Sequence, residues 1–226
     1  LWIKEDEVER AMEIDSIAMR IRQVAVKRSM VKKDSTAQKL TTTPYKFREQ
    51  YTSIHHSVVV PMVSSENRPY LPVGLLRSVD IVQEKAFALY DAPLWNMALI
   101  ASRLHWVWIG TVCVRMRTDF SYSNTLGWNT FPVPKLTEKN KEDLTSCAEN
   151  ILLAREAHFP ATIADLYDPE KMPENLQRAH GRNDEVLERI YIGRKFKNDT
   201  ERLEKLFDMY TKMTDDKPKK TKKKVS

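Results

Sequence analysis

The sequence contains little glycine. Only five of its 226 residues are glycine, and each is isolated: Gly74, Gly110, Gly127, Gly181 and Gly193. A phosphate-binding loop or a dinucleotide fingerprint needs several glycines at fixed spacing, because the backbone must approach the phosphates closely. The sequence therefore excludes nucleotide-binding sites of these two kinds.

The sequence also lacks a long apolar run. Its most apolar window, residues 98–114, is interrupted by Arg103 and His105, whereas a membrane span needs about 18 apolar residues. The first ten residues are rich in acidic side chains and have no apolar core of the kind that signal peptides carry. Only two cysteines occur, Cys113 and Cys147, and their apolar surroundings predict reduced thiols. We expect a cytoplasmic protein without membrane association and, because it begins with Leu1, part of a longer chain.

No set of residues forms a recognisable catalytic or metal site. His55 and His56 are adjacent in front of a predicted strand, so their side chains point to different faces, and no cysteine or histidine follows at ligand spacing. His105 and Cys113 lie among apolar residues and favour packing roles. Asp165 and the residues after it are typical of helix caps and turns. We expect no catalytic residue and no metal in this chain.

Basic residues are concentrated near the start of the chain. Residues 17–48 contain nine lysines and arginines against a single acidic residue, Asp34. Residues 135–213, in contrast, carry 14 basic and 16 acidic residues, a net charge of −2. A local basic excess predicts a polyanionic partner, and an ordinary solvated helix face is the alternative.

Apolar spacing predicts a mixed α/β region followed by helices. Before Pro134 we expect helices over 14–30 and 93–109, with strands at 58–60, 73–76, 80–82, 87–89, 111–114 and 126–131. After Pro134 we expect a helix with Thr137 as its N-cap, then helices at 163–167, 174–180, 184–190 and 199–213. The prediction is an α+β fold: a mixed α/β domain over 1–134, an all-α domain over 135–213 and a disordered lysine-rich tail over 214–226.

Three segments resemble one family. PMVSSENRPYLPVGLL (61–76), SRLHWVWIGTVCVRMRTDFSYSNTLGWNTFPVP (102–134) and LYDPEKMPENLQRAH (166–180) are similar to the C-terminal part of MmeI-like type II restriction–modification enzymes, which are adenine-specific DNA methyltransferases. Two departures occur: Gly127 and Trp128 stand where a Val/Leu-Tyr pair is usual, and Val114 where glycine commonly precedes the arginine.

The resemblance implies a target recognition domain followed by a helical C-terminal domain. The parent protein would carry an S-adenosylmethionine-dependent adenine-N6 methyltransferase domain upstream, often after a nuclease. This chain has no Asn-Pro-Pro-Tyr motif, so we expect it to bind double-stranded DNA without a cofactor or catalysis of its own. A protein-interaction or scaffold module with a solvated basic face is the alternative function.

Arg117 and Asp119 are the main candidates for contacts to DNA bases. Alternation along an extended chain would place both side chains on one side. Arg117 could then donate to guanine O6 and N7 while Asp119 accepts from the cytosine amino group. In the family that this stretch resembles, the two corresponding positions vary together and set one base pair. The resemblance also places Ser121, Glu84 and Lys85 among the specificity positions, and a surface ion pair between Arg117 and Asp119 is the alternative.

Other polar and basic residues are candidates for contacts to the DNA backbone. Such contacts give affinity without sequence information. The candidates in the first helix and the loop after it are Arg20, Arg22, Lys27, Arg28, Lys32 and Lys33. Those in later segments are Ser64, Ser65, Arg68, Arg115 and Tyr122. For the loop at 64–70 the alternative is a structural one, in which Glu66 and Arg68 bridge each other.

Overall fold

The computed structural model describes residues 1–215, which form two compact units, Leu1–Thr52 and the chain from Ser53 onward. The tail expected at 214–226 lies outside the described residues, except for Thr214 and Asp215 at the end of the last helix. Within residues 1–215, no helix has the length and apolar character needed to cross a membrane.

The first unit is entirely helical. Its elements are a short 3-10 turn η1 (Glu5–Glu7) and the helices α1 (Val8–Met12), α2 (Asp15–Ser29) and α3 (Ser35–Lys39). The helix predicted at 14–30 is confirmed as α2, which buries Ala18 and Ile21. The prediction missed α3, which Asp34 caps by accepting hydrogen bonds from the backbone N–H groups of Thr36 and Ala37, both at 3.0 Å.

An antiparallel sheet begins the second unit. It has the order β3-β1-β4, from β1 (His56–Pro61), β3 (Gly74–Arg77) and β4 (Ala86–Tyr90). The central strand buries Val58 and Val60, as its apolar run predicted. The strand expected at 80–82 is wrong. Asp80 instead accepts hydrogen bonds from the backbone and guanidinium of Arg77, which turns the chain away from the sheet.

A second small sheet has the order β2-β6-β5, from β2 (Val63–Ser64), β5 (Arg115–Met116) and β6 (Asp119–Ser121). The polar stretch around Arg117 is therefore a hairpin. The strand expected at 126–131 is wrong, because Ser123 caps a short π-helical turn η2 (Asn124–Trp128) by accepting from the Leu126 N–H at 3.2 Å.

The helix predicted over 93–109 is two helices, α4 (Trp95–Ile100) and α5 (Arg103–Val112). Ser102 separates them: its hydroxyl donates to the Leu99 carbonyl at 2.7 Å and accepts from the His105 N–H at 3.1 Å. Because α5 continues to Val112, the strand expected at 111–114 is wrong. A short apolar run has no periodicity that distinguishes a strand from a buried helix end.

The remaining elements are all helices, as expected: α6 (Glu138–Glu156), α7 (Ile163–Leu166), α8 (Glu174–Ile192) and α9 (Asp199–Asp215). Thr137 caps α6 by accepting from the Asn140 N–H at 3.2 Å. The two helices predicted at 174–180 and 184–190 are one helix, α8, which passes through Gly181 and ends at Gly193 with φ of 77°.

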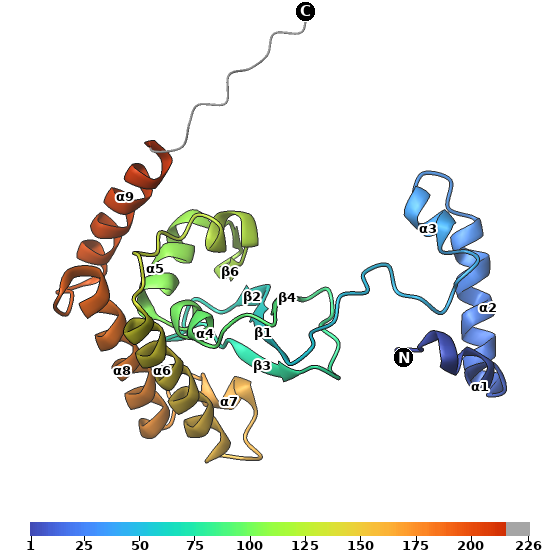
Figure 1. The fold of residues 1–226 in the computed structure, drawn as a ribbon, viewed down its shortest axis with the longest axis horizontal. Helices are drawn as coiled ribbons and strands as arrows, with labels where there is room; N and C mark the ends of the chain where they lie inside the picture. Colours follow the sequence, from blue (N-terminus) through green and yellow to red (C-terminus); the bar gives the residue numbers. More distant parts are fainter. Residues whose placement is uncertain (216–226) are drawn as a thin grey trace, which may run out of the picture. The chain divides into compact units, whose positions relative to one another are not determined.

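In the second unit, α4 and α5 lie between the strands and the C-terminal helices α6, α8 and α9 (Figure 1). Trp108 of α5, which is 1% exposed, packs on Phe207 and Tyr210 of α9. The chain is thus a mixed α/β part followed by a helical part, as predicted. The helices after Pro134 pack within the same compact unit as α4 and α5, so packing is continuous across the boundary expected there.

Candidate nucleic-acid interface

The β5–β6 hairpin presents an arginine at its tip. Met116 pairs with Asp119, so Arg117 and Thr118 form the two-residue turn. Arg117 has a backbone φ of 62°, a left-handed conformation that favours glycine in such turns. Its side chain is exposed and makes no hydrogen bond or ion pair within residues 1–215. The guanidinium of Arg117 is therefore exposed to solvent at the turn of the hairpin, without a partner in the described part of the chain.

The relation expected between Arg117 and Asp119 is changed by this turn. Alternation holds only along extended backbone, and the left-handed Arg117 interrupts it, so the extended chain on which that prediction relied is not formed. No ion pair joins the two side chains in the described part of the chain. The surface ion pair that was the alternative role is therefore not formed here.

The base of the hairpin is anchored on the protein. Arg115 forms an ion pair with Glu66 and lies over the Phe120 ring at 4.8 Å. Phe120 in turn packs edge-on against Trp106 of α5, with ring centroids 4.7 Å apart. The bridge between Glu66 and Arg68, which was the structural alternative for this loop, is not formed, because Glu66 pairs with Arg115. Arg115 is thus engaged within the protein, while the Arg68 side chain has no hydrogen-bond or ion-pair partner among residues 1–215.

Met62 hydrogen-bonds to two segments that contain candidate residues for base contacts. Its N–H donates to the carbonyl of Lys85 at 3.0 Å, and its carbonyl accepts from the N–H of Tyr122 at 2.7 Å. The Glu84 and Lys85 side chains are each 85% exposed and lie 3.4 Å from one another. The fold therefore brings the segment with Glu84 and Lys85 and the segment that follows Ser121, which are far apart in sequence, to the same residue, Met62.

Two predicted DNA-backbone contacts do not fit the structure. Tyr122 is 5% exposed, and its hydroxyl lies 3.0 Å from Nε2 of His105. Ser64 is 4% exposed in β2. Neither side chain is presented to a large ligand, so both predictions are wrong. Ser65 remains partly exposed, and its hydroxyl accepts from the Asn67 N–H at 3.4 Å.

His105 and Cys113 have the packing roles expected of them. Desolvation lowers the pKa of His105 to about 3, and burial raises the pKa of the Cys113 thiol. Both cysteines are free and buried. No group of three or more potential metal ligands occurs within residues 1–215. His56 instead places Nε2 at 2.8 Å from the Ala92 carbonyl.

The sequence prediction missed a small aromatic pocket beside the hairpin. It has a volume of about 150 Å³ and includes Phe87, Tyr122 and Trp128 in its lining, with the exposed Asn124 and Asn129 also contributing. Aromatic residues within an otherwise polar stretch were the only indication in the sequence. The pocket lies beside both segments that Met62 joins.

In the first unit, α2 carries most of the predicted phosphate contacts. Arg20, Arg22 and Lys27 are exposed on the helix, and Lys32 and Lys33 are exposed after it. Arg28 is different. Its guanidinium donates to the carbonyls of Leu40, Thr43, Pro44 and Lys46, at distances from 2.8 to 3.4 Å. Arg28 holds the following loop, which corrects its predicted role as a free phosphate ligand.

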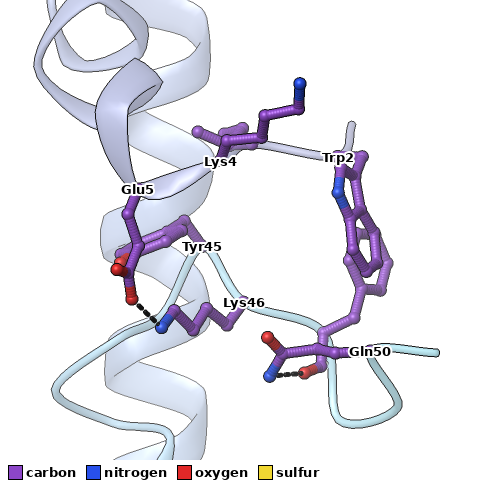
Figure 2. Close-up of a pocket in the computed structure, with 8 residues that line it drawn as sticks. Trp2, Lys4, Glu5, Tyr45, Lys46 and Gln50 are labelled. Carbon is purple, nitrogen blue, oxygen red and sulfur yellow. Dashed lines mark hydrogen bonds and ion pairs between the residues drawn. The ribbon is translucent and has the colours of Figure 1, made fainter. Parts of the chain in front are cut away.

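A pocket of about 170 Å³ lies between the start of the chain and the segment at 45–50 (Figure 2). Figure 2 shows Lys46 pointing to Glu5, with which it forms an ion pair. On the other side, Trp2 stacks on Phe47 with ring centroids 5.7 Å apart. The ion pair holds the pKa of Glu5 below its usual range. These contacts tie the two ends of the unit together and leave little net charge in the pocket.

Comparison with known proteins gives consistent matches over nearly the whole chain. Residues 1–135 match the family model of the MmeI target recognition domain, and residues 136–217 match that of the MmeI C-terminal domain. DNA methyltransferase A of Bacillus subtilis (strain 168) is 37% identical over 215 residues, covering 95% of this chain. The structure of the type IIL restriction–modification enzyme MmeI in complex with DNA is similar with a TM-score of 0.86 at 27% identity, over 95% of this chain. The chain spans 24% of the length of the first relative and 29% of the second.

Proposed function

This chain belongs to the family of MmeI target recognition domains, followed by the MmeI C-terminal domain, and we propose that it recognises a specific sequence in double-stranded DNA. The observation that carries the proposal is the family match over residues 1–135, the part that contains the exposed hairpin and the basic helix. The similar MmeI structure was solved in complex with DNA, which supports the same function for this chain.

In this proposal the second unit supplies the contacts to bases. Arg117 in the turn of the hairpin and Asp119, the first residue of β6, read one base pair, with arginine donating to guanine and aspartate accepting from cytosine. Ser121 at the end of β6, and Glu84 and Lys85 in the segment that hydrogen-bonds to Met62, contribute further base contacts. A hairpin of this size fits the major groove, which admits a two-stranded ribbon.

The first unit and one loop supply contacts to phosphates. Arg20, Arg22 and Lys27 on α2 and the lysines after it are exposed and carry positive charge. Ser65 and Arg68, in the loop after β2, have partly exposed side chains and add further donors. These contacts raise the affinity for any DNA sequence and make it depend on salt.

We propose further that the parent protein is an adenine-N6 DNA methyltransferase that uses S-adenosylmethionine. The similarity to DNA methyltransferase A supports this activity. The cofactor would bind in a methyltransferase domain joined upstream, because this chain contains neither an Asn-Pro-Pro-Tyr motif nor a glycine-rich loop. In such an enzyme, the recognition domain holds the duplex while the catalytic domain acts on an adenine turned out of the helix.

The test is selection of DNA by the chain itself. Residues 1–226 are incubated with a pool of randomised duplexes, and bound molecules are sequenced at several salt concentrations. We expect enrichment of one short motif and an affinity whose logarithm falls linearly with the logarithm of salt concentration. Salt-sensitive binding without a motif would reject sequence recognition, and absence of binding would favour a protein-interaction module.

A further inference from the structure

The loop between β2 and β3, residues 65–73, is attached at both ends to other parts of the second unit. We call this segment the strut. At its start, Glu66 forms the ion pair with Arg115 at the base of the hairpin. Directly before it, Ser64 of β2 pairs with Phe120 of β6. The start of the strut is therefore coupled to the hairpin that carries Arg117.

The far end of the strut is held by the C-terminal helix α8 through Tyr70. The Tyr70 hydroxyl donates to Oδ2 of Asp184 at 2.8 Å. The Tyr70 ring stacks on His180, one turn earlier on the same helix, with centroids 4.2 Å apart and an interplanar angle of 15°. Asp184 is 9% exposed and His180 is fully buried, so this contact is enclosed by protein.

Two arginines complete the attachment. Arg103 donates its backbone N–H to Oδ1 of Asp184 at 2.7 Å, and its guanidinium reaches the Pro69 carbonyl at 3.4 Å. The buried Arg155 of α6 donates to the carbonyl of Val73 at 2.6 Å. Thus the helices fix the strut at Pro69, Tyr70 and Val73, while its other end is attached to the hairpin.

We infer that Tyr70 and Asp184 are positioning residues for DNA recognition, through which the helical C-terminal part sets the placement of the β5–β6 hairpin. The inference rests on the proposed function. Neither side chain needs to touch DNA. Tyr70 and Asp184 act through Glu66 and Arg115, because a shift of the strut moves the residues to which the hairpin is bonded. Base contacts require close geometry, so a small displacement lowers discrimination between bases more than it lowers general affinity.

A purely structural role for the network is the competing explanation. In that case, loss of the Tyr70 hydroxyl would lower stability and would leave the selected motif unchanged. Tyr191 provides a matched control, because it lies on α8, the helix that Tyr70 contacts, is 6% exposed, and donates one hydroxyl hydrogen bond, to the Pro132 carbonyl at 2.8 Å. That bond is made at the connection to the helices and does not involve the strut.

The experiment compares Tyr70→Phe, Glu66→Gln and Tyr191→Phe in the 226-residue chain. Each variant is put through selection from randomised duplexes, with salt dependence and thermal unfolding measured in parallel. We expect Tyr70→Phe and Glu66→Gln to relax the same base positions, lowering discrimination there about threefold to tenfold, the size of one lost hydrogen bond. The salt slope should stay unchanged, and Tyr191→Phe should keep the wild-type motif at a similarly lowered unfolding temperature.

The outcomes separate the inference from the function on which it rests. A wild-type chain that selects no motif would reject the proposed function. A wild-type chain with a clear motif that Tyr70→Phe leaves unchanged, or that Tyr191→Phe relaxes equally, would overturn the positioning role. Should Tyr70→Phe unfold, Glu66→Gln tests the same path from the hairpin end, and its unchanged motif would also overturn the inference.

Discussion

Met116 pairs with Asp119 across the β5–β6 hairpin, and this register leaves Arg117 in the first position of the turn with φ of 62°. A residue with a Cβ is disfavoured in this conformation by about 1 kcal/mol or more. Strain of this kind is often retained where the side chain has a function. The exposed, unpaired guanidinium of Arg117 fits such a role, because an arginine at this position of the turn has no evident benefit for folding.

The first prediction separates the backbone of Arg117 from its side chain. Arg117→Gly should leave the free energy of unfolding unchanged or raise it by about 1 kcal/mol, because glycine adopts the turn without strain. The same variant should lose discrimination at one base pair of the selected motif. Arg117→Ala is the control, since it removes the guanidinium and keeps the strain. Urea unfolding and duplex selection measure the two effects, and a motif unaltered in both variants would remove Arg117 from the base contacts.

The second prediction concerns the two classes of arginine on α2. Changing the exposed Arg20 and Arg22 to alanine should lower the salt slope of DNA binding by about two units, because about 0.9 unit is lost per phosphate contact. Arg28→Ala should instead weaken the loop at 40–46, whose carbonyls lose their donor, at a cost of about 1–3 kcal/mol. Amide hydrogen exchange of residues 40–46 reports this loss. Faster exchange in the Arg20 and Arg22 variant, with its salt slope intact, would contradict the assignment.

Long amphipathic helices could be predicted from the sequence, because caps and periodicity are local. The α2 and α6 helices begin close to where Ile14 and Thr137 indicated. Around residues 111–114 the same approach failed. Within that short run only Cys113 is buried, whereas Thr111 and Val114 are exposed, so its apolar character did not reveal whether it was strand or helix.

The candidate site could be predicted only in part, since exposure depends on tertiary contacts. Polar side chains in one short stretch differ in exposure: Arg117 is exposed at the turn, whereas Tyr122 is buried against His105. The partner of Glu66 is equally non-local, because Arg115 lies 49 residues later in the chain. Sequence proximity favoured Arg68 as the partner, and the pairing of β2 with β6 selected Arg115.

The third prediction concerns stability in acid. Burial lowers the pKa of His105 and of His180 to about 3, so both are neutral in the folded protein at pH 5 and protonated when it unfolds. The contribution of the two histidines to the free energy of unfolding is present above pH 6.5 and is lost as the pH falls toward 3. Burial raises the pKa of Asp184 to about 6, despite the hydrogen bonds from Tyr70 and Arg103. The contribution of Asp184 to the free energy of unfolding has the opposite dependence: it is present below pH 3.8 and is lost as the pH rises to 6.

These three groups contribute to the slope of stability near pH 5, together with carboxyl groups whose pKa is lowered, such as Glu201. Unfolding takes up two protons at the histidines and releases one at Asp184, a net uptake of about one proton, or about 1.4 kcal/mol per pH unit. Asp184→Asn removes the opposing group, so the slope should rise by about one proton, or about 1.4 kcal/mol per pH unit. Urea unfolding between pH 4.5 and 5.5, followed by tryptophan fluorescence, measures it. Equal slopes in the two proteins would show that Asp184 is ionised in the folded state at pH 5.

The last prediction tests whether the helices after Pro134 complete the core of the second unit. Trp108 on α5 is covered by Phe207 and Tyr210 of α9, and α4, whose Met97 is fully buried, packs against α6. A chain ending at Pro134 would expose these apolar faces to water, and large exposed apolar patches promote association. We expect residues 1–134 to aggregate or form soluble oligomers, which light scattering detects.

The matched control deletes residues 1–52, which form a separate compact unit, and leaves the second unit intact. This chain should remain monomeric and keep the unfolding transition of the core. Because it lacks the basic helix, it should also bind DNA with a smaller salt slope while selecting the same motif. A monomeric 1–134 chain that selects the wild-type motif would contradict the argument, since neither the core nor the positioning of the hairpin would then depend on α6, α8 and α9.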